Sequence, residues 1–481
     1  MATPIPDNRA RFTLAELAQA CGGELRGVAA DAEVVGVVTD SRRVTAGNLY
    51  VALRGETHDG HAFARAACDA GAVAVLVARD AELAAELPAV GVDDTLRALG
   101  DIAALHRRRW GGRAVAITGS VGKTTTKELT FAALRATGLS VERTAGNLNN
   151  LIGLPMTLLA LDPETELAVL EIGTSAPGEI ARLAEIARPQ VGVVTAVAVA
   201  HAEGLGTLEG VAREKASLLW ALPEDGTAIY SADHEALCAE LEPVRARKLS
   251  FGRTEGADVR LTKHSVSATP ASRCEIAVAN EPAPIATELS LFGNGPAIDA
   301  AAALAVVLAV AGMGALSSAA EGMASVEPPA GRLCPVPGAH GALLVDDSYN
   351  ANPASVRASV ETTLELARAR GGRALLVLAD MLELGASEAR EHGAVGELAS
   401  RDGVAAFVAC GPRMRAAASV ARLARPDLTV HHVDDAGEAA ALIRPLLQPA
   451  DVVLVKGSRS MKTERVIEAL REGDSQGRAA T

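Results

Sequence analysis

The chain has 481 residues, 49% of them hydrophobic, and a formal net charge of −13 at pH 7. This length predicts about three domains of roughly 150 residues each. Aromatic residues make up only 2% of the chain, so the cores must be built mainly from Ala, Val and Leu. The acidic balance argues against a nucleic-acid partner and against docking on an anionic membrane surface.

Cysteine usage and hydropathy indicate the compartment. The six cysteines are scattered without a Cys-x-x-Cys pair, so neither a zinc site nor a disulfide framework is indicated. Residues 1–11 lack the apolar stretch of a signal peptide. The most hydrophobic segment, 298–313, is too short to span a bilayer comfortably. We expect a cytoplasmic protein with no stable membrane insertion, and a monomer by default.

The first predicted section covers residues 1–109 and ends in a basic cluster at 106–109. Short β-like runs at 34–39, 49–53 and 73–77 alternate there with Ala-rich helical stretches. This alternation predicts a small α/β domain.

A nucleotide-binding loop opens the second section, residues 110–330. The strand-like run 114–118 leads into Gly119-Ser120-Val121-Gly122-Lys123-Thr124-Thr125, and a helical pattern covers 127–137. Glycines let backbone N–H groups close around phosphate oxygens at the positive end of the helix dipole. Lys123 is placed to reach the outer phosphates and Thr124 to bind Mg²⁺. Because position 117 is Ile, the loop is shorter than the usual pattern, and a plain glycine-rich turn is the alternative.

Polar residues follow two strands of the same section. The apolar runs 167–172 and 191–199 are typical of strands buried on both faces of a parallel sheet, and helices are predicted at 179–187, 207–221 and 299–311. Glu171 and His201 therefore fall at the carboxyl edge, where open α/β sheets bind ligands. Glu171 is placed to share Mg²⁺ with Thr124, or to cap a turn. From position alone, a structural hydrogen bond explains His201 as well as a ligand role does. Exposure to solvent on its helix explains Lys215 better than a functional role does.

A Pro-rich break at 327–331 precedes the third section, residues 331–481. Strands predicted at 343–346, 374–378, 405–408 and 452–455 alternate with helices and form a third α/β unit. A polar cluster at 346–353 and a basic loop at 456–460 follow two of these strands. The first is also explained as a turn, and the second is a weak anion-binding pattern by itself.

Taken together, these motifs resemble the Mur ligases, the ATP-dependent amide ligases of peptidoglycan synthesis, over nearly the whole chain. In the first section the matching segments are 39–44 and 53–61, and in the second they are 118–126, 146–150, 170–173 and 201–206. In the third, 347–353, 380–385 and 456–459 are similar to the members that add D-alanyl-D-alanine.

The resemblance implies an α/β protein of three domains. Residues 1–109 would form a small α/β uridine-nucleotide domain that binds the UDP-muramoyl-peptide, and 110–330 a central P-loop ATPase with a mostly parallel sheet. Residues 331–481 would form a C-terminal Rossmann-like domain that binds D-alanyl-D-alanine and closes onto the nucleotide. The implied reaction joins D-alanyl-D-alanine to UDP-N-acetylmuramoyl-tripeptide through an acyl phosphate, with ATP converted to ADP.

The resemblance also implies site residues. The implied ATP-binding residues are Gly119, Ser120, Val121, Gly122, Lys123, Thr124, Thr125, Asp299, Arg332 and Asp347. Two Mg²⁺ ions would be held by Thr124, Glu171, His201 and Lys215, the last as a carbamate whose formation needs a neutral amine. The implied catalytic residues are Lys123, His201, Lys215, Arg332 and Asp347. The implied substrate-binding residues are Ser41, Arg42, Asn147, Asn150, Tyr349, Asn350 and Asn352.

Two departures from the family pattern concern the nucleotide site. The usual His-Asn-x-x-Asn reads Gly295-Pro296-Ala297-Ile298-Asp299 here, so Asp299 would have to accept a hydrogen bond from the adenine amino group. The usual Thr-Asn-x-Gly before His201 reads Thr195-Ala196-Val197-Ala198. Neither change removes a phosphate-binding or metal-binding group.

Three alternatives remain open. A relative that adds a single amino acid usually carries Asp-Asn-Pro-Arg in its third domain, and that element is absent from this chain. Folate polyglutamate synthetases have no counterpart of the first section. A P-loop nucleotide switch needs Thr124 and Glu171 but has no use for His201 with Lys215. The sequence leaves open which diamino acid the tripeptide carries.

Overall fold

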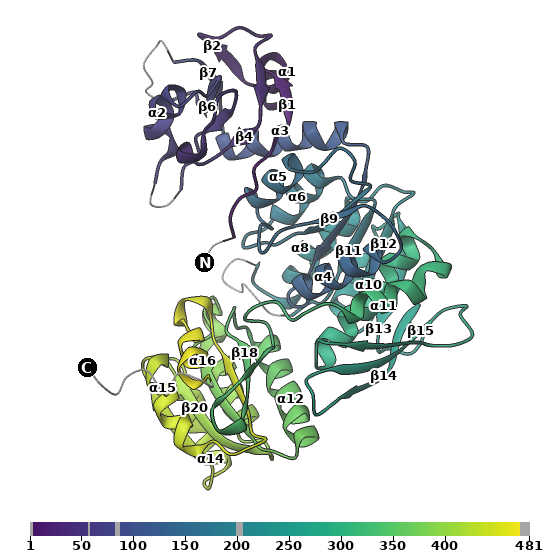
Figure 1. Ribbon diagram of the computed structural model, residues 1–481, viewed down its shortest axis with the longest axis vertical. Coiled ribbons are helices and arrows are strands. Elements are labelled where there is room, and N and C mark those ends of the chain that lie inside the picture. The colour runs from purple at the N-terminus through teal and green to yellow at the C-terminus, as the bar shows by residue number, and fades with distance from the viewer. Residues whose placement is uncertain (1–2, 56–57, 82–86, 199–204, 472–481) are drawn as a thin grey trace.

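The computed structural model describes residues 3–55, 58–81, 87–198 and 205–471. They form three successive α/β units, which Figure 1 shows stacked along the long axis of the molecule. The predicted fold class is therefore confirmed, while the domain boundaries at 109 and 330 stay predictions. No helix in the described ranges combines the length and the apolar character that a membrane span requires.

The first unit is built on a sheet of strand order β2-β7-β6-β5-β4, in which only the β2–β7 pair is antiparallel. A separate antiparallel pair, β1 with β3, lies beside it. The strands are β1 (Arg11–Thr13), β2 (Glu24–Arg26), β3 (Glu33–Val35), β4 (Val37–Val38), β5 (Leu49–Val51), β6 (Ala74–Ala78) and β7 (Ala89–Val92), and the helices are α1 (Leu14–Cys21), α2 (Ala64–Asp69) and α3 (Thr95–Arg109).

Helix α3 belongs to two units at once. Its buried residues Leu99 and Ile102 share one hydrophobic cluster with Leu183 and Ile186, which lie in the second unit. Arg107 adds a polar contact, because its Nε donates to the carbonyl of Ala187 at 2.7 Å. In Figure 1, α3 lies across the junction beside α5 and α6. The first unit is therefore fixed to the second through a common core.

The second unit holds a nine-stranded sheet of order β16-β15-β14-β13-β12-β11-β8-β10-β9. Its pairs are parallel except β14–β15 and β15–β16, which confirms the mostly parallel sheet. The strands are β8 (Arg113–Thr118), β9 (Val141–Arg143), β10 (Leu167–Glu171), β11 (Val191–Val194), β12 (Thr227–Ser231), β13 (Arg247–Gly252), β14 (Val259–Val266), β15 (Ser272–Val278) and β16 (Ile285–Leu289), and the helices are α4 (Lys123–Arg135), α5 (Gly153–Leu159), α6 (Glu179–Ala187), α8 (Leu208–Trp220), α9 (Glu235–Cys238), α10 (Asn294–Val310) and α11 (Leu316–Ala324).

Alternation along the central strand explains how both faces of this sheet are covered. In β8, Ala114 and Ala116 pack in the cluster that contains α5 and α6. Val115 and Ile117 point to the other face, in the cluster built with α4, α10 and α11. Successive strand side chains point to opposite faces, so the continuous apolar run is what a two-sided burial requires.

Two sequence expectations for this unit were wrong in extent. The strand expected at 191–199 ends at Val194, because the next residues bend over the phosphate loop, where Ser120 N–H donates to Ala196 O at 2.8 Å. The helix expected at 299–311 spans Asn294–Val310, and a further helix, α11, follows it and packs against α4. The antiparallel strands β15 and β16 were not predicted either.

The third unit has a sheet of order β17-β18-β22-β19-β20-β21, parallel except for β17–β18. One face packs against α12, α13 and α14 and the other against α15 and α16. The strands are β17 (Cys334–Pro337), β18 (Leu343–Asp347), β19 (Ala374–Ala379), β20 (Val404–Cys410), β21 (Thr429–Val433) and β22 (Val452–Lys456), and the helices are α12 (Pro353–Arg370), α13 (Glu388–Ala399), α14 (Arg415–Ala424), α15 (Ala436–Ile443) and α16 (Glu464–Leu470).

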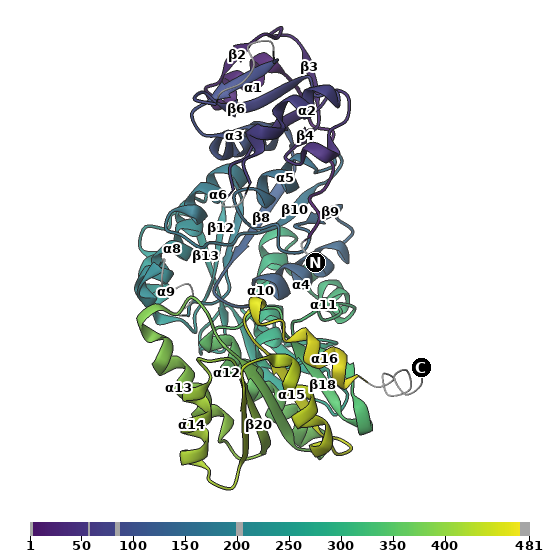
Figure 2. The same cartoon turned by 90° about the vertical axis from the view of Figure 1, so that its left-hand side faces the viewer.

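The second and third units meet at the side where functional loops are expected. Figure 2 shows α10 and α12 at this junction, and the two helices are in contact. Phe292, which directly precedes α10, is buried in the core of the third unit. Loops from both sheets therefore face one another across the junction.

Candidate active site

The phosphate loop joins β8 to α4 and contains two glycines. A larger residue at either position would displace neighbouring atoms. Gly122 caps α4 with φ +84°, and a Cβ there would lie 2.4 Å from Asp299 Oδ1. A Cβ at Gly119 would lie 1.9 Å from Thr195 Oγ1. Thr195 in turn donates from Oγ1 to Val121 O at 2.6 Å. The loop is thus held tightly at the helix N-terminus, where backbone N–H groups are available to an anion.

Lys123 and Thr124 are the first two residues of α4, and their side chains contact different partners. Lys123 Nζ donates to Gly119 O at 2.6 Å, so the lysine folds over its own loop. Burial lowers the pKa of Lys123, and the Arg332 charge acts in the same direction while Glu171 opposes it. Lys123, Arg332 and Glu171 line the same cavity.

Glu171, at the end of β10, is fully buried and bound from three sides. Its Oε2 accepts from Thr124 Oγ1 at 2.9 Å and its Oε1 accepts from Asn149 Nδ2 at 2.8 Å. Lys127 Nζ lies 3.6 Å from Oε2. Thr124 and Glu171 are therefore in direct contact, while their sharing of Mg²⁺ stays a prediction.

Lys215 lies on α8 and is buried rather than solvated. Burial and the neighbouring charge of Lys123 lower its pKa to about 7, although Glu214 opposes the shift. Glu214 is committed elsewhere, because it accepts the N–H groups of Gly178 and Ile180 at 2.8 and 3.0 Å. An amine that is substantially neutral at physiological pH is the form that reacts with CO₂. His201 lies outside the described residues.

The donor set fits a hard divalent cation. Mg²⁺ takes oxygen ligands and is usually held by one or two carboxylates together with substrate phosphates. Thr124 and Glu171 supply a hydroxyl and a carboxylate beside the phosphate loop. Among the described residues, no cluster of three or more His, Cys, Asp or Glu side chains could hold a metal by itself. A cation here would therefore depend on phosphate oxygens for much of its coordination.

Two cavities adjoin the loop. The phosphate-loop cavity, of about 640 Å³, runs from the phosphate loop to the third unit. Most of the predicted ATP-binding residues line it: Ser120, Val121, Gly122, Lys123, Thr125, Asp299, Arg332 and Asp347. Of the other two, Gly119 gives its carbonyl to Lys123, and Thr124 lines the second cavity.

Asp299 lies beneath the loop, on α10. Its Oδ1 accepts from Thr126 Oγ1 at 3.0 Å, and burial raises the pKa of the carboxyl to about 8. The protonated form can donate as well as accept a hydrogen bond. This position thus keeps part of the hydrogen-bonding capacity of the asparagine usual in the family.

Asp347 ends β18 in the third unit and is the centre of a buried network. Its Oδ2 accepts from Lys456 Nζ and from Ser359 Oγ, both at 2.6 Å. Lys456 Nζ also donates to Asn350 O at 2.9 Å. Arg332 reaches the same region from the linker, with its guanidinium 4.2 Å from the ring centroid of Tyr349. The predicted third-domain residues therefore converge on the nucleotide side.

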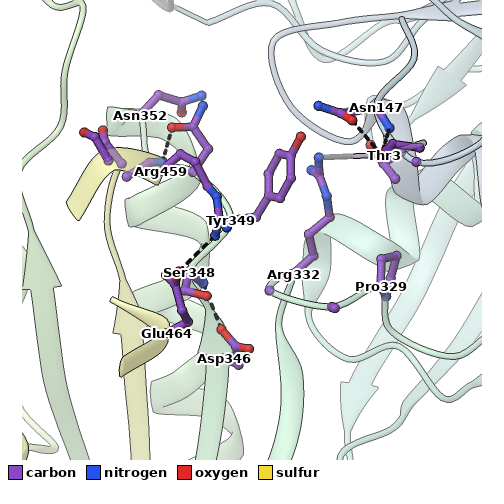
Figure 3. A pocket seen from close by; sticks show the side chains of 18 of the residues that line it. Thr3, Asn147, Pro329, Arg332, Asp346, Ser348, Tyr349, Asn352, Arg459 and Glu464 are labelled. Atoms are coloured by element: carbon purple, nitrogen blue, oxygen red, sulfur yellow. Dashed lines mark hydrogen bonds and ion pairs between the residues drawn. The ribbon is translucent and has the colours of Figure 1, made fainter. Parts of the chain in front are cut away.

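The interdomain cavity, of about 1120 Å³, is lined from all three units. Figure 3 shows Thr3 and Asn147 on one side, Arg459 and Asn352 on the other, and Tyr349 and Arg332 between them. Thr3 Oγ1 donates to Asn147 Oδ1 at 2.7 Å. This space is large enough for peptide substrates next to the phosphate loop.

Two of the predicted substrate residues also have structural roles. Asn150 Oδ1 accepts the N–H groups of Ile152 and Gly153 at the start of α5. Asn352 Oδ1 accepts from Ser355 N at 2.8 Å and caps α12. Their carbonyl oxygens are therefore engaged, and their amide NH₂ groups are what they can offer a ligand.

Ser41 and Arg42 are not brought to this site. They lie on a single 3₁₀ turn of the first unit, residues Ser41–Arg43, and neither lines the two cavities. Arg42 is exposed and pairs with Asp40 at 2.7 Å. Their predicted uridine-nucleotide role thus concerns a separate surface.

Several residues that line the phosphate-loop cavity were not predicted from the sequence. Asp233 and His234 come just after β12, the strand next to β11 in the sheet. Leu291 and Phe292 precede α10 and add an apolar wall. The position of Asp233 after a parallel strand was the available signal, but its use required knowing that β12 neighbours β11.

Comparisons with known proteins agree with this architecture in every unit. The Mur ligase family catalytic domain model matches residues 33–107, the Mur ligase middle domain 117–307, and the Mur ligase glutamate ligase domain 331–459. The UDP-N-acetylmuramoyl-tripeptide–D-alanyl-D-alanine ligase of Escherichia coli K12 is 37% identical, over 96% of this chain and 98% of that protein.

Solved structures match over the same extent. A crystal structure of MurF from Acinetobacter baumannii aligns with a TM-score of 0.85 and 29% identity, over 97% of this chain and 99% of that one. The MurF ligase of Thermotoga maritima in complex with ADP aligns with a TM-score of 0.80 and 28% identity, over 90% and 96%. The chain therefore belongs to the Mur ligase family, in the branch formed by the MurF proteins.

Proposed function

We propose that this protein is the ligase that adds D-alanyl-D-alanine to UDP-N-acetylmuramoyl-tripeptide, with ATP converted to ADP. The observation that carries the proposal is the pair of adjoining cavities. One is lined by the phosphate loop, and the other opens beside it between the three units. Full-length similarity to ligases of this name supports the same reaction.

The chain's own groups account for the first half of the reaction. A carboxylate of the tripeptide attacks the γ-phosphate of ATP, and an acyl phosphate and ADP result. Phosphoryl transfer depends mainly on positioning and charge stabilisation. Lys123 and the backbone N–H groups of the loop hold the phosphates, and Arg332 adds positive charge from the linker.

Magnesium and a modified lysine complete the proposal. Thr124 and Glu171 would hold one Mg²⁺, and His201 with carbamylated Lys215 would hold a second. The ions would neutralise phosphate charge and so lower the barrier to attack. The low pKa of Lys215 supports the carbamate, since only the neutral amine adds CO₂.

The second half of the reaction belongs to the interdomain cavity. The amine of D-alanyl-D-alanine attacks the acyl phosphate carbonyl, an amide forms, and inorganic phosphate leaves. Asn147 and Asn150 from the second unit, and Tyr349, Asn350 and Asn352 from the third, are the proposed substrate contacts, while Asp347 is proposed to close onto the nucleotide. Ser41 and Arg42 are proposed to bind the uridine nucleotide on the first unit. We also propose that the enzyme is cytoplasmic and monomeric. Its six free cysteines fit a reducing compartment.

Phosphate release tests this function directly. The purified protein is assayed with Mg²⁺-ATP, UDP-muramoyl-tripeptide and D-alanyl-D-alanine, omitting each in turn. We expect release only when all are present, together with a UDP-muramoyl-pentapeptide identified by mass spectrometry. Release with ATP alone would indicate a nucleotide switch. Release that requires a single amino acid in place of the dipeptide would indicate the neighbouring ligase type.

A further inference from the structure

The interdomain cavity is lined, among the described residues, by three cationic side chains: Lys127, Arg332 and Arg459. Lys127 is fully buried and already committed, because its Nζ donates to Gly146 O at 3.1 Å and lies 3.2 Å from Glu128. Arg332 also lines the phosphate-loop cavity. Of these two cavities, Arg459 lines only the interdomain one, so its charge is directed to a substrate other than the nucleotide.

The backbone that carries Arg459 is held rigidly at the end of β22. Ser458 N–H donates to Asp380 O at 3.1 Å, and Ser458 Oγ accepts from Leu382 N at 3.0 Å. A Cβ at Gly457 would lie 2.7 Å from the Cβ of Ala379, so this turn packs closely against the neighbouring strand β19. The base of the arginine is therefore fixed, and only its side chain extends into the cavity.

The guanidinium of Arg459 retains capacity for a ligand. Its side chain is 55% exposed, and its Nη1 lies 3.5 Å from Glu464 Oε1. A partly exposed pair at this distance contributes little stability. Five N–H donors arranged as a planar fork leave room for a second carboxylate, which such a fork can bind with two parallel hydrogen bonds.

We propose that Arg459 binds the free carboxylate of the dipeptide acceptor and thereby distinguishes a dipeptide from a single amino acid. This inference rests on the proposed function. D-alanyl-D-alanine carries an amine that must reach the acyl phosphate and a carboxylate that takes no part in the reaction. That carboxylate stays charged and needs a cation in the cavity. Figure 3 shows Arg459 across the interdomain cavity from Thr3 and Asn147.

Length provides the discrimination. Each residue adds roughly 3.5 Å to an extended chain. When the amine of a dipeptide is at the reacting carbon, its carboxylate reaches one residue farther than that of a single amino acid. An arginine on a fixed turn pairs with the carboxylate of the longer ligand. The carboxylate of the shorter ligand does not reach it and stays unpaired.

The test compares two acceptors, D-alanyl-D-alanine and D-alanyl-D-alaninamide, which differ only in the charge of the terminal group. We expect the unaltered enzyme to favour the acid by roughly 10- to 100-fold in kcat/KM, the effect of one charged hydrogen-bonded pair. Arg459→Ala should lose this preference through a higher KM for the acid, with kcat/KM for the amide unchanged. Arg459→Lys should keep part of the preference. The KM for ATP should stay the same throughout.

The matched control is Arg465→Ala, which removes an exposed arginine on α16 that lines neither cavity. It should retain the full acid-to-amide ratio. The proposal is overturned if the unaltered enzyme uses acid and amide equally, or if Arg459→Ala keeps the original ratio. Absence of turnover with D-alanyl-D-alanine in the unaltered enzyme would instead overturn the proposed function. The comparison of acceptors on the unaltered enzyme does not depend on any variant folding.

Discussion

Burial of ionisable side chains in this site has a cost in stability, and Lys215 is the clearest case. Its amine is buried on α8 close to Lys123, and its pKa falls to about 7. The folded state then binds fewer protons than the unfolded state between about pH 7 and 10.5. Stability must therefore rise with pH across this window, since the unfolded state takes up the additional proton.

We predict that Lys215→Met abolishes ligase turnover and removes this pH dependence. In CO₂-depleted buffer, the unaltered protein should gain roughly 2 kcal/mol relative to the variant between pH 7 and 9 in urea denaturation. Lys248→Met, at an exposed position, should behave like the unaltered protein. Lys215→Ala should also lose turnover, and acetate or another short carboxylate should partly restore it, because the shorter side chain leaves room for the added carboxylate. Full turnover without rescue would remove Lys215 from the mechanism, and an unchanged pH slope would contradict its burial as a neutral amine.

Residues within a local motif could be predicted, whereas residues brought together by the sheet could not. Lys123 and Thr124 are determined by a continuous strand–turn–helix pattern, and Glu171 by its place at a strand end. The position of Asp233 and the pairing of Lys456 with Asp347 depend on which strands become neighbours, and no local pattern reports that order. Sequence reasoning also could not show that the oxygen of Asn352 would cap a helix.

At the scale of elements, the phosphate loop depends on the close approach of α4 and α10. Gly122 has φ +84°, and a Cβ there would lie 2.4 Å from Asp299 Oδ1, whose carboxyl group is buried against Thr126. A larger residue would therefore bring left-handed strain and would displace the carboxyl group of Asp299. The loop geometry therefore requires glycine for two separate reasons.

Gly122→Ala tests this dependence against a control on the same helix. We expect the KM for ATP to rise roughly tenfold or more, because strain of about 1–3 kcal/mol would fall on the phosphate loop. Gly138, just beyond α4, has φ +89° and no atom within 4 Å of an added Cβ. Gly138→Ala should therefore lower stability through strain alone and leave the KM for ATP unchanged. Equal KM values for the two variants would show that the approach of Asp299 is unimportant.

Elements with strong periodicity were predicted close to their observed bounds, and irregular ones were not. The helix at Glu179–Ala187 agrees at both ends, since Gly178 precedes it and Arg188 ends it in a left-handed conformation. The strands β14 to β16 were missed because they carry polar residues at their more exposed positions and lack the continuous apolar runs that predicted the central strands. Tertiary pairing rather than local pattern stabilises such strands.

At the scale of the whole molecule, the three units differ in whether each has a hydrophobic core of its own. The third unit has its own two-sided core. The first unit lacks such separation, because the cluster around α3 continues into α5 and α6 of the second. Side-chain packing confirms the join: a Cβ at Gly100 would lie 2.7 Å from Ile186 Cδ1. The sequence boundary at 109 falls at the end of the helix that carries the shared core.

A fragment ending at residue 109 should therefore fail to fold cooperatively, whereas a fragment of residues 1–330 should fold. Cutting after α3 exposes the face that carries Leu99 and Ile102, and burial of such side chains contributes about 1.5–3 kcal/mol each. A small α/β unit with total stability of about 5–15 kcal/mol cannot lose several of these contacts. Circular dichroism during thermal unfolding measures the outcome. A sharp transition in the 1–109 fragment would contradict the shared core, and it would show that the first unit docks on the second as a finished domain.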